Sequence, residues 1–512
     1  MDQKDYWLKN FSENKHFIQE LPGMFHAADY VGVAAVSKIK KYFPNVNKKI
    51  FMLCNQNYLY WCYDSNDVLA EAKDFVTKVM ASPSYLVEIF NQWREIEKEF
   101  YHLLMRLDKI DFTNLSLLEM KELYHQFKEL YTEEYSSPMI CDQTSFYAEI
   151  KIVEKLKEIT KGDRDKLREY LSTLSLPVSE FFLSKEQYDL YTIILNFIDK
   201  NKKEVFLLSL DELKRTIDPL DLKEIQEHAQ KYHWIQNNYL NIEKLSVDFF
   251  INRIKEHMLD ESKVKNYVDN YFSILEKNKE EKAALVEELD LDLELKTILK
   301  ISDLHGYWQD LRKKANITAN YYVKLFMEVA SKKTNVSFNE ISMLTVDEFE
   351  LLLKKGKLDL DFVKERKGEH AVVYLADERV HYQGGQAKKL FEIMQNKENV
   401  DNIVDFRGTP VSTGKVVATA RIILDPNNDT LKEGEILITG MTRPEFVPLM
   451  KKAVAVVTNE GGMTRHAAII SRELGLPCIV GTKIATKAIK DGDIIEVNAN
   501  HGVVKILERF TS

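Results

Sequence analysis

The most informative stretch of the chain lies between residues 456 and 477, where an apolar segment is followed by two glycines and then by an amphipathic segment. This order predicts a strand, a glycine loop and a helix. Gly461 and Gly462 allow backbone conformations and close contacts that larger residues would obstruct. Thr464 is a suitable N-cap, which places His466 in the first turn of the predicted helix.

His466 is the residue of this stretch that can do chemistry. A helix N-terminus stabilises an anion through its N–H groups and its dipole. An imidazole with a pKa of about 6.5 is largely neutral at pH 7, so a ring nitrogen can attack phosphorus and later release it. The pattern favours a histidine that carries a phosphoryl group, a role that needs no metal ligands. We expect Ala467, Ile470 and Leu474 to face the core.

Spacing alone does not establish this role, because a single His near a helix start is more often a cap or a surface residue than a nucleophile. The surrounding residues, however, closely resemble the active-histidine signature of the family of phosphoenolpyruvate synthases and pyruvate phosphate dikinases. The matching residues are Gly461-Gly462-Met463-Thr464-x-His466-Ala467-Ala468 and Ser471-Arg472-Glu473-Leu474-Gly475-Leu476-Pro477. The resemblance identifies His466 as the phosphorylated residue.

The resemblance extends over residues 406–507, since residues 408–414 are similar to the segment that opens the family's domain and residues 442–448 to the loop before its first helix. It implies that four residues support the phosphate site: Gly461, Gly462, Thr464 and Arg465. Thr464 also corresponds to a threonine that regulatory proteins phosphorylate in some members. Arg465 replaces the small residue usual at its position, a departure that bears on regulation more than on chemistry.

A second group of polar and aromatic residues lies in the stretch His-Ala-Gln-Lys-Tyr-His-Trp. It contains His228, Tyr232, His233 and Trp234. At helical spacing such residues are usually part of a packed core. The alternative is that they line a pocket for a phosphoryl acceptor, as polar and aromatic groups do in ligand sites.

Two parts of the chain have different hydrophobic periods. From about residue 66 to 355, apolar residues recur at every third or fourth position, which predicts helices. Strands are predicted before and after this region, at residues 49–53, 58–63, 370–375 and 379–382. The C-terminal part instead has short apolar strands, predicted at 415–424, 435–439, 453–458, 478–480, 494–497 and 503–507, with helices at 443–452 and 464–474.

This pattern predicts a multidomain protein. A large, mostly α-helical domain over residues 1–394 is followed by a linker over 395–405 and by a small α/β domain over 406–512. The resemblance implies that the small domain is a swivelling phosphohistidine domain and that the large domain binds the acceptor.

The composition excludes several classes of protein. Residues 1–402 contain 57 Lys and Arg against 68 Asp and Glu, and this acidity disfavours a nucleic-acid partner. The four cysteines show neither disulfide nor metal-finger spacing. The polar N-terminus and the lack of long apolar runs predict a cytoplasmic protein without a membrane partner or a metal site.

Complete dikinases have an ATP-grasp domain that phosphorylates the histidine, and many end with a TIM barrel; neither is recognised in this sequence. The arrangement is similar to rifampin phosphotransferase without its ATP-grasp domain, and to the histidine subunit of phenylphosphate synthase. It implies one subunit of a split phosphotransferase, with no tightly bound cofactor. We expect a separate ATP-grasp protein to use Mg-ATP to phosphorylate His466, which then passes the group to a small-molecule acceptor.

Two alternatives remain open at this point. In the first, the chain is a phosphocarrier whose acceptor is another protein, like enzyme I of the sugar phosphotransferase system. In the second, it is a non-catalytic binding or regulatory homologue that keeps the fold. The absent barrel counts against the first alternative. The complete signature around His466 counts against the second.

Overall fold

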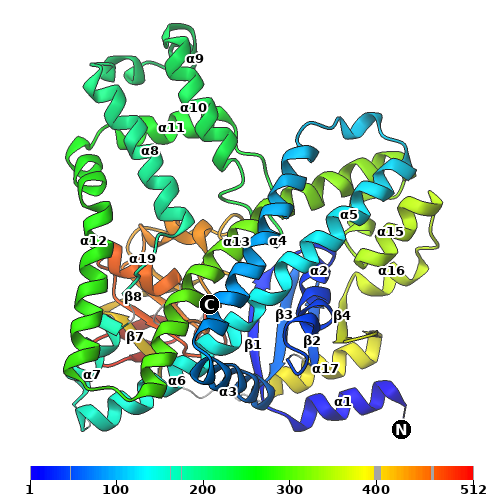
Figure 1. The fold of residues 1–512 in the computed structure, drawn as a ribbon, viewed down its shortest axis with the longest axis horizontal. Coiled ribbons are helices and arrows are strands. Elements are labelled where there is room, and N and C mark those ends of the chain that lie inside the picture. Colours follow the sequence, from blue (N-terminus) through cyan, green and yellow to red (C-terminus); the bar gives the residue numbers. More distant parts are fainter. Residues whose placement is uncertain are drawn as a thin grey trace.

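The computed structural model describes residues 2–46, 48–161, 163–174, 176–396, 405–462 and 466–510. Figure 1 shows a large helical part and a smaller α/β part packed against it, as the sequence predicts. Within the described residues no helix is both long and apolar enough to cross a membrane. All four cysteines are described and buried, and none forms a disulfide.

An antiparallel sheet lies within the N-terminal part. Its order is β1-β3-β2-β4-β5, and its strands are β1 (His16–Pro22), β2 (Lys49–Asn55), β3 (Tyr58–Asp64), β4 (Glu369–Leu375) and β5 (Arg379–Gln383). The four strands predicted from the sequence are confirmed, whereas β1 was not predicted. Side chains alternate between two apolar faces, so that Ile50 and Met52 join the main core while Phe51 and Leu53 pack with α1 and α17.

The main helical bundle covers the first of these faces. Its longest member, α13, is 42 residues long and begins at the N-cap Asp292, whose side chain accepts a hydrogen bond from the backbone N–H of Leu295. The helices of this part are α1 (Gln3–Glu13), α2 (Phe25–Val36), α3 (Ser65–Ala81), α4 (Ser84–Leu107), α5 (Leu117–Ser136), α6 (Ile140–Thr160), α7 (Arg164–Leu174), α13 (Leu293–Thr334), α14 (Phe338–Ile341), α15 (Val346–Lys355), α16 (Asp361–Arg366) and α17 (Gly384–Asn396).

A group of helices projects from the bundle at the top of Figure 1 and has its own hydrophobic core. Phe197, Ile225 and Phe250 are completely buried there. The helices are α8 (Phe182–Asp199), α9 (Leu210–Thr216), α10 (Pro219–Tyr232) and α11 (Val247–His257), and α12 (Glu261–Glu288) packs along α8. We call residues 182–268 the helical projection.

The C-terminal part is built on one sheet of order β6-β13-β12-β8-β9-β10-β11-β7. Strands β8, β9, β10 and β11 are mutually parallel neighbours, and the other pairs are antiparallel. The strands are β6 (Asp405–Arg407), β7 (Thr409–Ser412), β8 (Lys415–Ile422), β9 (Ile436–Thr439), β10 (Ala455–Thr458), β11 (Cys478–Val480), β12 (Ile494–Asn498) and β13 (Val503–Glu508). The helices are α18 (Val447–Met450), α19 (His466–Leu474) and α20 (Ala485–Ala488).

The two faces of this sheet have different partners. Ile436, Ile438 and Val457 belong to a core of the C-terminal part itself. The alternate residues Leu437 and Val456 belong to the large core that also contains the helical bundle. The helical part and the sheet therefore share buried apolar surface, and α19 lies between them.

Two details of the C-terminal part differ from the sequence prediction. The helix expected at residues 443–452 is a 3₁₀ turn at Pro444–Phe446 followed by the single helical turn of α18. Leu474, expected in the core, is 36% exposed because it lies at the last residue of α19, where the chain turns toward Gly475. The linker expected at 395–405 falls mostly on residues 397–404, which lie outside the described residues.

Candidate functional site

Two parallel strands bring the central residues of the site together. β9 and β10 are paired in register, with Thr439 opposite Thr458. The loops that leave their carboxyl ends therefore emerge at the same edge of the sheet, which is where open α/β sheets bind ligands. Thr442 lies in the first loop and His466 follows the second, at the first residue of α19.

The glycines of the second loop allow it to make tight contacts. Gly461 has a φ of +120°, a conformation that residues with side chains rarely adopt. Gly462 packs against α6 so closely that a Cβ atom there would lie 2.4 Å from a carboxylate oxygen of Glu149. The loop that precedes His466 is therefore in contact with the helical part of the molecule.

The imidazole of His466 is oriented by one neighbour. Its Nδ1 lies 3.0 Å from the hydroxyl oxygen of Thr442. Its Nε2 is covered from solvent and has no hydrogen-bond partner among the described residues. When Nδ1 carries the proton and donates a hydrogen bond to the hydroxyl oxygen of Thr442, the lone pair of Nε2 is available for attack.

The charges of two cations act on this imidazole. Burial, and then the charges of Lys313 and Arg443, lower the pKa of His466 to about 3. Lys313 belongs to α13 of the helical part, and Arg443 follows Thr442 in the loop after β9. A neutral imidazole is a suitable nucleophile for phosphorus, and positive charges that act on it also attract the phosphoryl group that it gains.

The remaining residues predicted to support the phosphate site, Thr464 and Arg465, lie outside the described residues. Helix α19 begins at His466, so the imidazole is located at the positive end of the helix. Among the described residues no cluster of three or more His, Cys, Asp or Glu has the arrangement of a metal site.

The structure places His228 and Tyr232 on α10, in the helical projection. His228 Nε2 lies 3.0 Å from Glu186, which also accepts a hydrogen bond from Arg253 at 2.6 Å. The hydroxyl of Tyr232 donates to Asp189 at 2.6 Å. These polar groups are therefore engaged with one another inside the projection.

His233 and Trp234 follow directly at the end of α10. Trp234 is buried and its ring lies 5.8 Å from that of Phe182 in the core of the projection. His233 packs its ring edge-on to Tyr321 of α13, with centroids 5.2 Å apart. The four residues thus lie together at the end of α10.

Four residues that contact or act on His466 or its glycine loop were not assigned a role from the sequence: Glu149, Lys313, Thr442 and Arg443. Thr442 and Arg443 lie in a segment that was noted only for its resemblance. Glu149 and Lys313 come from helices remote in sequence. No local pattern marks them, because they reach the site only through packing of the two parts.

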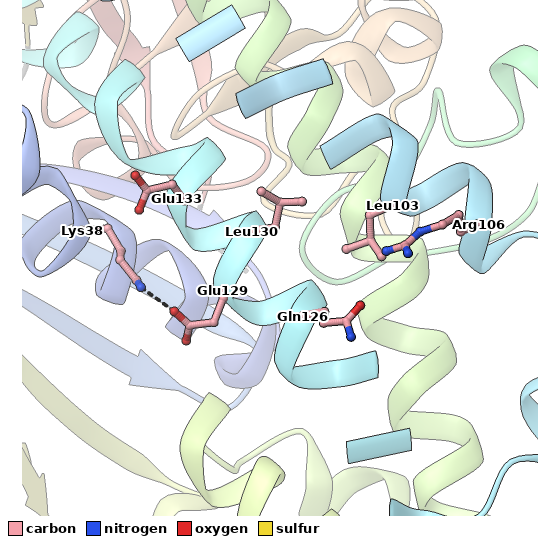
Figure 2. A pocket seen from close by; sticks show the side chains of 7 residues that line it. All are labelled: Lys38, Leu103, Arg106, Gln126, Glu129, Leu130 and Glu133. Carbon is pink, nitrogen blue, oxygen red and sulfur yellow. Dashed lines mark hydrogen bonds and ion pairs between the residues drawn. The ribbon is translucent and has the colours of Figure 1, made fainter. Parts of the chain in front are cut away.

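A shallow pocket lies elsewhere on the molecule, beside α4 and α5 (Figure 2). It is lined by Lys38, Leu103, Arg106, Gln126, Glu129, Leu130 and Glu133. Lys38 and Glu129 form an ion pair of 2.6 Å across one side of it. The residues of this pocket are distinct from those around His466.

Comparison with known proteins identifies the C-terminal part. Residues 431–502 match the family described as "PEP-utilising enzyme, mobile domain". Over 101 residues the chain is 56% identical to a probable phosphoenolpyruvate synthase of Staphylothermus marinus, and over 168 residues 39% identical to one of Archaeoglobus fulgidus. Over 193 residues it is 34% identical to a rifampicin phosphotransferase of Bacillus cereus.

These matches cover 19%, 32% and 36% of the present chain. They cover only 12%, 22% and 22% of the respective relatives, so the chain corresponds to less than a quarter of each of those proteins. The match includes the strands, the glycine loop and the helix that position His466. Residues 431–502 of this chain are therefore similar to the mobile domain of the PEP-utilising enzyme family.

Proposed function

We propose that this protein is a phosphotransferase component of the dikinase type, in which His466 accepts a phosphoryl group and passes it to a small molecule bound by the helical part. One observation carries the proposal: the imidazole of His466 is buried and held by Thr442, and its Nε2 has no hydrogen-bond partner among the described residues. This arrangement favours both accepting a phosphoryl group and transferring it.

The donor in this proposal is Mg-ATP bound by a separate ATP-grasp protein. The sequence before residue 395 contains no glycine-rich loop of the kind that holds nucleotide phosphates, which supports a nucleotide site on another polypeptide. The C-terminal part would swing about residues 395–405 to reach this partner and would then return to the helical part. Such hinge motions are common in enzymes that separate two half-reactions.

The acceptor is proposed to be a small molecule with a nucleophilic oxygen, held near α6 and α13. The contact between Gly462 and Glu149 supports this location, because it places the loop before His466 against α6. Similarity to a rifampicin phosphotransferase makes rifampicin one compound to test.

Intact mass spectrometry tests the first half-reaction. The purified chain is incubated with Mg-ATP, with and without a candidate ATP-grasp partner protein, and with phosphoenolpyruvate as another donor. We expect one acid-labile phosphate that appears with the partner and is absent from His466→Ala. If none of these donors phosphorylates the protein, or if His466→Ala is phosphorylated equally, the proposal is wrong.

A further inference from the structure

The segment between α10 and α11 contacts the C-terminal part through two asparagine side chains. Asn238 Nδ2 donates a hydrogen bond of 3.2 Å to Glu445, in the loop that follows β9. Asn241 Nδ2 donates one of 3.1 Å to Asp425, in the loop that follows β8. Because β8, β9 and β10 are parallel neighbours, both loops leave the same edge of the sheet as the loop before His466. One short segment of the helical part therefore holds two loops at the edge where the site lies.

The hydrogen bonds of Asn238 fix the direction in which its amide group faces. Its Oδ1 accepts from the backbone N–H groups of Leu240 and Asn241, at 2.8 and 2.7 Å. Its Nδ2 is therefore the end that meets the carboxylate of Glu445. Burial raises the pKa of Glu445, and the charge of Arg443 and the bond from Asn238 oppose that shift. Since a buried carboxylate that loses a donor is costly, this bond favours the docked state.

The helical part anchors the segment from behind. Asn320 of α13 is completely buried and donates a hydrogen bond of 3.1 Å to the backbone carbonyl of Asn238. Lys324, one turn further along the same helix, donates one of 2.7 Å to the backbone carbonyl of Ile242. The backbone is thus held at both ends of the segment, so the amides of the two asparagines are presented to the C-terminal part in a preset orientation.

The two loops that receive these bonds lie next to the site. Glu445 is three residues after Thr442, whose hydroxyl oxygen contacts the imidazole of His466. Asp425 Oδ1 also accepts a hydrogen bond of 3.1 Å from the backbone N–H of Asn427, which holds its carboxylate in place. Docking at Glu445 therefore fixes the loop that orients His466, and docking at Asp425 fixes the loop of the adjacent strand.

We propose that Asn238 and Asn241 form an asparagine clamp that holds the C-terminal part against the helical part and fixes the Thr442 loop in the position from which His466 transfers its phosphoryl group. The clamp joins neutral amides to carboxylates, and water solvates both kinds of group when the parts separate, so the contact is reversible. This inference rests on the proposed function and extends it by naming residues that position His466 for transfer to the acceptor.

Asn196 provides a matched control. Its Nδ2 donates a hydrogen bond of 3.3 Å to Glu224, which is the same amide-to-carboxylate bond, but both residues belong to the helical projection. Asn238→Asp places a second carboxylate opposite Glu445, and Asn196→Asp does the same opposite Glu224. Like charges repel in both variants, but only the first change lies between the two parts.

Hydrogen exchange at the backbone amides of the full-length protein measures docking. Phe446, Leu449 and Met450 belong to the core that the C-terminal part shares with the helical bundle, so the amides of residues 446–453 exchange faster when the parts separate. The amides of α5 lie within the bundle and report whether each variant is folded.

We expect Asn238→Asp to accelerate exchange in residues 446–453 by at least about tenfold, because exchange follows the undocked population. Asn196→Asp should leave it unchanged. Asn241→Asp, opposite Asp425, should act in the same direction by a smaller factor, since its bond is less buried. It also tests the clamp if Asn238→Asp does not fold.

A polarity swap tests whether the pair of side chains is responsible. When Asn238→Asp is combined with Glu445→Gln, the amide introduced at position 445 donates to the carboxylate introduced at position 238. The double variant should therefore return exchange close to the wild-type rate. Unchanged exchange in both clamp variants, equal acceleration in Asn196→Asp, or no recovery in the double variant would overturn the inference.

The two proposals fail in different ways. If donors phosphorylate His466 but the clamp variants leave exchange unchanged, the proposed function holds and the clamp is wrong. If the clamp variants respond as expected but no donor phosphorylates His466, the clamp joins the two parts and the carrier function is wrong.

Discussion

His466 and His228 are both covered by protein, but their surroundings differ in the sign of the nearby charge. His228 lies 3.0 Å from the carboxylate of Glu186, which Arg253 also contacts, so the imidazole belongs to a closed hydrogen-bonded network. His466 contacts the hydroxyl of Thr442, and the charges that act on it are those of Lys313 and Arg443.

This difference separates a structural imidazole from a reactive one. A carboxylate satisfies the N–H group of a neighbouring imidazole, so little remains for a ligand. Cations favour the neutral imidazole and attract an added phosphoryl group. Burial alone is therefore a poor indicator of function, whereas the charge facing the ring is informative.

The largest expected effect is the loss of phosphate uptake in His466→Ala. His228→Ala should still be phosphorylated, because its imidazole is engaged with Glu186. Intact mass after incubation with the donor system measures both variants. If phosphate uptake were lost in His228→Ala and kept in His466→Ala, His228 would be the reactive histidine and His466 the structural one.

Replacing Thr442 by Val should slow phosphorylation of His466 by about 100-fold, because the imidazole loses the hydroxyl that orients it. Thr442→Ser keeps the hydroxyl and should retain most of the rate. Quenched-flow measurement of the phosphorylated fraction gives both rates. Equal rates for the Val variant and the wild type would show that orientation of Nδ1 is not required.

His228→Ala should lower the free energy of unfolding by about 3 kcal/mol, since it removes buried packing and leaves Glu186 with one fewer partner. Lys223→Ala on the same helix should change it by less than about 1 kcal/mol, because its ion pair with Glu227 is exposed. Urea denaturation compares the two variants. A similar loss in both would contradict a structural role for His228.

The smallest expected effect concerns pH. The pKa of His466 is about 3 when the parts are docked, against about 6.5 for a solvated imidazole, so separation of the parts is accompanied by proton uptake. Docking should therefore be strongest above pH 6.5 and weaken below it, by at most about 1.4 kcal/mol per pH unit.

Small-angle X-ray scattering at pH 7.5 and pH 5 measures this change as an increase in the radius of gyration. His466→Asn cannot titrate in this range and should respond less to pH than the wild type. An identical response of both proteins would assign the pH dependence to other groups.

Parts of the fold could be predicted because their signals are local. The change from a helical to a strand period near residue 400 separated the two parts, and the strand, glycine loop and helix around His466 follow from adjacent residues. Strand β1 was missed because its residues do not alternate cleanly between apolar and polar. The expected helix at 443–452 was too long because Pro444 and Pro448 limit it to short turns.

The sequence by itself determined which residue is the candidate phosphoryl carrier and which small domain holds it, since both are encoded within one continuous stretch around His466. Only the tertiary structure decided what faces that residue. Thr442 meets it because β9 and β10 are parallel neighbours. Glu149 of α6 reaches the glycine loop, and the charge of Lys313 acts on His466, because the helical part and the sheet share one apolar core. Contacts between segments this far apart are set by the burial of shared apolar surface, which leaves no local pattern around the residues involved.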